Sequence, residues 1–113
     1  MHEVSLIENV LALVEHERQK QPFMRVTRIR LTLGALGCAQ PDALLFCFDA
    51  VTRGTVAEGA QLEIVTTPGQ GWCADCQDTV TLEERFGACP VCNSHRVRMT
   101  GGHALLLSEM EVE

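Results

Sequence analysis

A chain of 113 residues, of which 46% are hydrophobic and 21% charged, has the composition of one small globular domain, or of a domain with a small satellite. Its net charge of −6 at pH 7 has the wrong sign for a protein that binds nucleic-acid backbones. No apolar run approaches the ~18 residues of a transmembrane helix, and acidic residues interrupt the first helical pattern, so we expect a cytoplasmic protein without membrane contact.

The first predicted element is an amphipathic helix. Ser5-Leu6-Ile7-Glu8 has the S-x-x-E form of a capping box, which predicts a helix start at about Ser5 and leaves residues 1–4 outside the helix. Apolar residues then recur at helical spacing: Ile7, Val10, Leu11 and Val14. Lys20-Gln21-Pro22 ends the element.

A strand, a second helix and two further strands follow. Residues 25–33 alternate, with Ile29, Leu31 and Leu33 on one face and Arg28, Arg30 and Thr32 on the other. Gln40-Pro41-Asp42 opens the second helix, because proline is well tolerated in a first turn. The apolar face of this helix is predicted to be Leu44, Leu45, Cys47, Phe48 and Val51. Residues 61–66 and 104–112 are predicted strands.

Glycine-rich boundaries at residues 68–71 and 100–102 separate this pattern from a segment with four cysteines. The predicted fold is therefore α/β (α+β), with two helices packed on a small mixed sheet and a four-cysteine zinc ribbon inserted between two strands. We expect a discontinuous domain of residues 1–68 and 98–113, and a zinc-ribbon domain of residues 69–97.

The cysteine pairs predict a metal site. Cys73 and Cys76 form one C-x-x-C pair and Cys89 and Cys92 the other, with twelve residues between the pairs. Two such knuckles complete a tetrahedron of thiolates, which favours a closed, structural Zn(II) site. Iron is the main competitor, because Cys-Pro-x-Cys knuckles also occur in rubredoxin-like sites. With few apolar residues of its own, the segment is expected to depend on the metal for folding.

The remaining cysteines and three of the four histidines carry no metal-site spacing. Cys38 and Cys47 are expected to be core thiols. We expect His16 to be solvated and His103 to lie at the surface. His95, three residues after Cys92, could border the metal site, although four cysteines already fill a tetrahedron.

The start of the chain, MHEVSL, offers a second set of ligands. The α-amine of Met1, the amide nitrogen of His2 and its imidazole form adjoining chelate rings, a nitrogen-rich arrangement that suits Ni(II) or Cu(II). A histidine at position 2 is also compatible with no function. The residues alone leave both interpretations open.

The whole chain resembles the HypA/HybF family, the nickel metallochaperones of hydrogenase maturation. The resemblance rests on MHEVSL, RVTRIRLTLGAL, FCFDAVTRGTVAEGAQLEI, the paired knuckles and the ending SEMEVE. The sequence departs from the family pattern in one place. Several relatives carry histidine directly after the second knuckle, whereas here Asn93 occupies that position and His95 comes two residues later.

The resemblance implies a non-enzymatic carrier with a nickel-binding domain and a zinc domain. Ni(II) would be the cargo, bound by His2, by the Met1 amine and by Glu3 as a ligand or orienting group, and Zn(II) would be structural at Cys73, Cys76, Cys89 and Cys92. It further implies delivery to the [NiFe]-hydrogenase large-subunit precursor with an accessory GTPase, by a monomer or weak homodimer. The alternatives are a zinc-ribbon adaptor for protein interactions, with an inert N-terminus, and a small iron redox protein.

Overall fold

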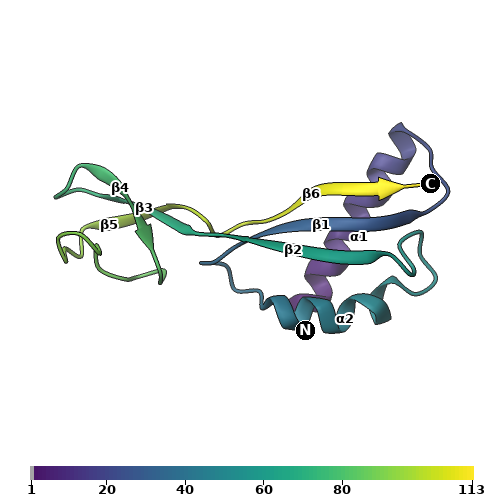
Figure 1. The fold of residues 1–113 in the computed structure, drawn as a ribbon, viewed down its shortest axis with the longest axis horizontal. Helices are drawn as coiled ribbons and strands as arrows, with labels where there is room; N and C mark the ends of the chain where they lie inside the picture. Colours follow the sequence, from purple (N-terminus) through teal and green to yellow (C-terminus); the bar gives the residue numbers. More distant parts are fainter. Residues whose placement is uncertain (1) are drawn as a thin grey trace. The chain divides into compact units, whose positions relative to one another are not determined.

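The computed structural model describes residues 2–113, and Met1 lies outside the described residues. Two helices and six strands follow one another along the chain (Figure 1): α1 (His2–Lys20), β1 (Val26–Gly34), α2 (Pro41–Thr52), β2 (Gln61–Thr67), β3 (Gly69–Cys73), β4 (Asp78–Leu82), β5 (Val97–Gly101) and β6 (Leu105–Val112). No helix among residues 2–113 has the length and apolar character needed to cross a bilayer.

The first sheet has the strand order β2-β1-β6 and is mixed. β6 runs antiparallel to β1, because Gly34 N–H donates to Ala104 O at 2.9 Å while Met24 N–H, at the opposite end, donates to Glu113 O at 2.7 Å. β2 runs parallel to β1, since Ala35 N–H donates to Thr67 O at 2.8 Å and earlier residues of both segments pair in the same order. α2 makes the crossover connection that a parallel pair requires.

The helices cover one face of this sheet. Within unit 1, the buried residues of β1 and of the two helices are Ile7, Val10, Val14, Ile29, Leu31, Leu44, Cys47 and Phe48, and Leu33 continues the buried side of β1. The alternation predicted for residues 25–33 is thus confirmed. Leu45 was predicted on the apolar face of α2, but it is exposed. The buried side of α2 is formed by Leu44, Cys47 and Phe48, which is a narrower set than the apolar residues in its sequence.

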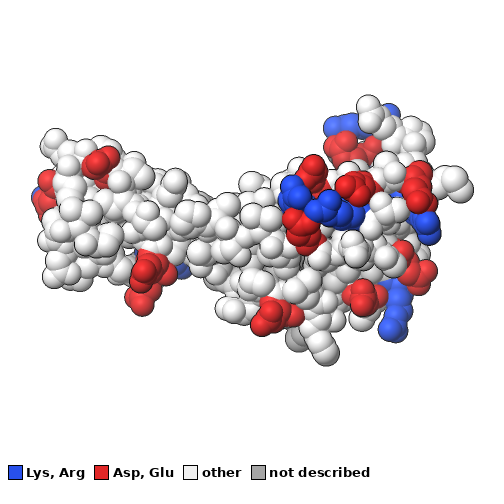
Figure 2. All heavy atoms as spheres, viewed as in Figure 1, with Lys and Arg blue, Asp and Glu red and all other residues white. Residues whose placement is uncertain are grey.

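The opposite face of the sheet carries ion pairs (Figure 2). Arg28 and Arg30 of β1 pair with carboxylates of β2 and β6, and Arg25, just before β1, pairs with Glu113, just after β6. The pairs are Arg25–Glu113, Arg28–Glu63, Arg28–Glu111, Arg30–Glu63 and Arg30–Glu109. Side chains of cross-strand neighbours lie within reach of one another on a pleated sheet. These five ion pairs, which we call the ion-pair ladder, neutralise the charges on the solvent side of the sheet.

The start of α1 differs from the prediction. The helix begins at His2 instead of Ser5, so residues 2–4 are helical and not extended. Val4 lies one turn before the buried Ile7 and is itself half-buried, which gives the additional turn an apolar contact. The acidic Glu3 in the first turn suits the positive end of the helix dipole. An S-x-x-E pattern does not distinguish a cap from a serine inside the first turns.

The second sheet has the order β4-β3-β5, with antiparallel pairing on both sides of β3. These three strands are only five residues each and were not predicted individually. Cys73, at the end of β3, pairs with Asp78 on one side and with Val97 on the other.

Residue contacts divide the chain into two compact units. Unit 1 comprises residues 1–31, 39–65 and 106–113; unit 2 comprises residues 32–38 and 66–105. Unit 2 thus takes in the end of β1 and the residues after it. The division into domains of residues 1–68 with 98–113, and 69–97, remains a prediction about which parts fold separately.

Candidate metal centre

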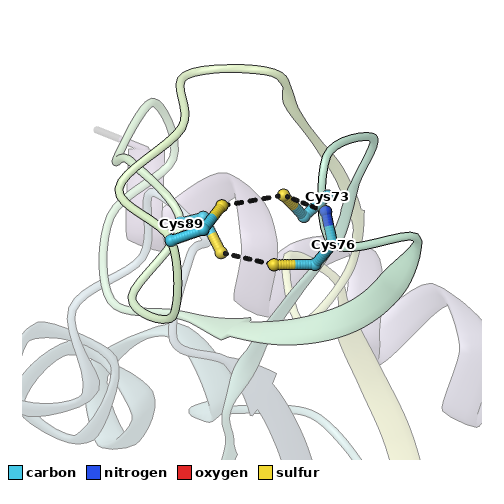
Figure 3. Close-up of side chains that lie close together, drawn as sticks. Cys73, Cys76 and Cys89 are labelled. Carbon is cyan, nitrogen blue, oxygen red and sulfur yellow. Dashed lines mark hydrogen bonds between the residues drawn. The ribbon is translucent and has the colours of Figure 1, made fainter.

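Four cysteine sulfurs converge at one end of the second sheet (Figure 3). Cys73 ends β3 and Cys76 lies in the turn to β4, while Cys89 and Cys92 lie in the loop before β5. All four Sγ atoms lie within 4.8 Å of one another. The side chains drawn in Figure 3 point toward a common centre.

The sulfur spacing fits a tetrahedral metal. The Sγ atoms of Cys73 and Cys92 are 3.6 Å apart, and those of Cys76 and Cys89 are 3.8 Å apart. A tetrahedron with metal–sulfur bonds of ~2.3 Å has edges of ~3.8 Å. A disulfide needs an S–S distance of only ~2.0 Å, so these spacings match a zinc-ribbon-like metal site and not a pair of disulfides. Cysteine ligands at all four corners leave no open position for substrate.

Main-chain amides support the thiolates. Cys76 N–H donates to Cys73 Sγ, and Val91 N–H donates to Cys89 Sγ, both at 3.4 Å. The backbone N–H groups of Cys92 and Val91 lower the pKa of the Cys89 thiol to about 7. The neighbouring Cys92 side chain and burial raise the pKa of Cys76 well above its usual range. A metal that binds all four thiolates must therefore displace protons, so the affinity of the site for the metal decreases as the pH is lowered.

A polar link joins the two knuckles beside the sulfurs. Asp75 accepts hydrogen bonds from the Ser94 hydroxyl and, at 2.9 Å, from the Arg96 guanidinium. Ala74 N–H also donates to Arg96 O at 2.9 Å. The Asp75–Arg96 pair is exposed and adds little stability. These contacts instead connect the first knuckle to the segment that follows the second knuckle. The sequence spacing of Asp75, Ser94 and Arg96 did not predict this connection.

A small apolar cluster supports the cysteine centre from below. Its buried members are Leu36, Cys73, Val80, Leu82 and Cys89, with Cys76, Val97 and Met99 packed against it. Leu36 comes from the segment after β1, far from the cysteines in the sequence. Arg85 Nε donates to Leu36 O at 2.7 Å, which ties the loop after β4 to the same segment.

The predicted nickel ligands lie at the start of α1. His2 is the first residue of α1 and is exposed, and Glu3 is half-buried. Met1, whose amine was the third predicted ligand, lies outside the described residues. Within residues 2–113, no group of three or more His, Cys, Asp or Glu side chains converges apart from the four cysteines.

The exposure of the remaining histidines and cysteines can be compared with what was predicted for them. His16 and His103 are exposed, as expected, and His95 is exposed as well. Cys47 is buried and its thiol donates to Leu44 O at 3.6 Å. Cys38 is exposed, so its prediction as a core thiol was wrong, because Leu36 and Ala39 are the residues of this segment that turn inward.

Comparisons with known proteins agree with one another. Residues 1–112 match the family model described as HypA, "Hydrogenase/urease nickel incorporation, metallochaperone". The chain is 65% identical to the hydrogenase maturation factor HypA of Methylocella silvestris over 100% of both chains, and 52% identical to that of Rhizobium leguminosarum bv. viciae over 99% of both. The solution structure of the nickel metallochaperone HypA from Helicobacter pylori shares the fold, with a TM-score of 0.70 at 21% identity, covering 97% of this chain and 96% of that one.

Proposed function

Because this chain belongs to the HypA family of nickel-incorporation metallochaperones, we propose that it carries Ni(II) at its N-terminus and delivers it to the [NiFe]-hydrogenase large-subunit precursor. The relatives' name, hydrogenase maturation factor, supports a role among hydrogenase maturation components. The observation that carries the nickel site is the exposed position of His2 at the first residue of α1. The four cysteines hold structural Zn(II) and keep unit 2 folded.

The helical start of the chain is compatible with chelation. The first amide N–H groups of an α-helix have no partner within the helix, so the amides of His2 and Glu3 are available for metal binding. An extended conformation of residues 2–4 is therefore not required for the amide and imidazole of His2 to bind one Ni(II).

The charge balance assigns a role to Glu3. A cation at a helix N-terminus opposes the helix dipole. The carboxylate of Glu3 in the first turn, together with a deprotonated amide, offsets this effect, whether Glu3 binds the metal or orients His2.

Exposure of the site suits a carrier. A metal held by one imidazole and main-chain nitrogens at the surface can pass to a partner by stepwise exchange of ligands. A closed set of four ligands, as at the cysteines, would retain its metal instead. Cargo and structural metal are thus assigned to an open and a closed set of ligands, respectively.

Release requires a partner, for which we propose an accessory GTPase. The chain has no G-x-x-x-x-G-K-[ST] motif, since its sole lysine, Lys20, follows glutamine. We expect the purified protein to be no enzyme and to hydrolyse neither GTP nor ATP. Turnover that co-purifies with the chain through several columns would contradict this part of the proposal.

The nickel site is tested by titration of zinc-loaded protein with Ni(II). His2→Ala is expected to weaken binding at least tenfold while zinc content and helicity stay unchanged, because the side chain is exposed. His16→Ala, an exposed histidine later on the same helix, is the matched control and should bind as wild type.

Extension of the chain tests the backbone ligands. One or two residues placed before Met1 should also damage nickel binding, although every side chain remains. Full Ni(II) affinity in the extended protein would exclude the amine as a ligand. Full affinity in His2→Ala would remove the site and favour the zinc-ribbon adaptor instead.

A further inference from the structure

An exposed aromatic side chain lies in the loop between β4 and the second knuckle. Phe86 is 94% exposed, and Val91, inside the knuckle itself, is 76% exposed. Neither side chain contributes to the apolar cluster below the cysteines. Aromatic residues, phenylalanine included, are enriched at protein interfaces relative to the rest of the surface.

The loop that carries Phe86 is held in place. Arg85 donates through Nε to Leu36 O at 2.7 Å, and Gly87 N–H donates to Glu84 O at 3.3 Å, closing a turn around Phe86. The second knuckle anchors the loop at its other end through Cys89. A side chain presented from an anchored loop loses less conformational entropy on binding than one on a mobile segment.

A cleft of about 400 Å³ opens beside this loop. Its lining is Thr81, Glu83, Glu84, Gly87, Ala88 and Pro90. Neither glutamate forms an ion pair within residues 2–113, in contrast to the carboxylates of the ladder on the first sheet. The adjacent arginine, Arg85, is directed to Leu36. The cleft thus has carboxylates available for a cation from another molecule.

Charge selects the class of partner. The chain has 9 basic and 15 acidic residues, and four thiolates around one divalent metal add a further −2 beside the cleft. A second copy of this chain or a nucleic acid would bring more negative charge to this surface, which disfavours both. A basic protein segment complements it.

We propose that residues 81–91 form a docking surface for a protein segment that carries Lys or Arg beside a large apolar side chain. The apolar side chain packs on Phe86 and Val91, and the cation enters the cleft between Glu83 and Glu84. We call residues 81–91 the Phe86 surface. All of them belong to unit 2, whereas the proposed nickel ligands belong to unit 1, so binding at this surface does not require nickel.

Selection from a random twelve-residue display library on zinc-loaded wild-type protein tests the proposal. Enriched peptides should combine Lys or Arg with Leu, Phe, Trp or Met. Synthetic versions should bind at least tenfold more weakly to Phe86→Ala and to Glu83→Gln/Glu84→Gln. Phe46→Ala removes another exposed phenylalanine, 87% exposed on α2, and serves as the matched control that should bind as wild type. Amide NMR shifts on peptide addition should be concentrated in residues 81–91.

Four outcomes would overturn the proposal: no enrichment over bare support, enrichment of acidic peptides, peptides that bind Phe86→Ala as tightly as wild type, or concentration-dependent dimerisation that Phe86→Ala abolishes. Nickel titration of the same variants separates this test from the proposed function. Phe86→Ala should bind Ni(II) as wild type, and His2→Ala should bind the selected peptides as wild type.

Discussion

Gln77 and Asn93 occupy equivalent positions in the two cysteine knuckles. Each directly follows the second cysteine of its pair, and each has a left-handed backbone, with φ of 53° and 61° respectively. Each donates its N–H to the carbonyl oxygen of the first cysteine in its pair, at 2.8 Å in both knuckles. The two halves of the metal centre therefore share one backbone conformation, which aims both pairs of sulfurs at one point.

This conformation makes Asn93→Val a test of the knuckle. Asparagine tolerates the left-handed region, whereas a β-branched residue does not, so we expect a loss of about 1–2 kcal/mol in the free energy of unfolding of unit 2. Asn93→Gly should change it by far less. The measurement is urea unfolding followed by the fluorescence of Trp72, the only tryptophan, which lies in β3. His95→Val, at an exposed position, is the control; equal stability of Asn93→Val and wild type would remove the backbone argument.

Removal of one metal ligand should unfold the cysteine centre. Cys73→Ala or Cys92→Ala should lose zinc and the native NMR dispersion of residues ~70–97, because structural zinc supplies on the order of 10 kcal/mol to small zinc folds. The helices should persist, since their buried stripes lie in unit 1. Cys38→Ala, which removes an exposed cysteine, should keep one equivalent of zinc. One equivalent of zinc with native dispersion in either ligand variant would show that the four-cysteine assignment is wrong.

Leu36→Ala should weaken the same unit without touching a ligand. Leu36 is 3% exposed and packs against the cluster below the cysteines, so its truncation should cost about 2–5 kcal/mol. Zinc should then be lost to a chelator faster than from wild type, and Trp72 fluorescence should report unfolding at lower urea. Leu106→Ala, at an exposed position, is the control. Chelator kinetics unchanged from wild type would mean that Leu36 does not support the centre.

The ion-pair ladder predicts a pH-dependent part of stability. A hydrogen bond from Arg28 lowers the pKa of Glu63 below its ordinary value, so the paired carboxylate stabilises the fold above its unfolded pKa and ceases to do so as the pH falls through its folded pKa. Wild type should therefore be more stable than Glu63→Gln at about pH 6, and the difference should shrink as the pH falls below the ordinary carboxyl pKa and vanish once the pH is below the folded pKa of Glu63. Thermal unfolding of unit 1 by circular dichroism measures this. Glu8→Gln, on the exposed side of α1, should show no such convergence, and a pH-independent difference for Glu63→Gln would exclude the charge as its cause.

Local pattern was sufficient for much of the fold and for the cysteine site. The stripe from Ile7 to Val14, the alternation through β1 and the proline that opens α2 each express a repeat within one element, so they could be predicted from neighbouring residues. The paired C-x-x-C spacing likewise predicts its own geometry, because each knuckle is local.

Long-range contacts decided the rest. The helix start at His2 depends on how far the apolar contacts of α1 extend, and a capping pattern at Ser5 carries no information about that. The place of Leu36 under the cysteines, the exposure of Cys38 and the anchoring of Arg85 on Leu36 O depend on which distant segments meet. The sequence by itself determined the two helices, the strands of the first sheet and the four-cysteine cluster, since their periods and spacings are local. Only the tertiary structure decided where α1 begins, how the second sheet pairs and which residues support the cluster, because burial and pairing depend on contacts between residues far apart in the chain.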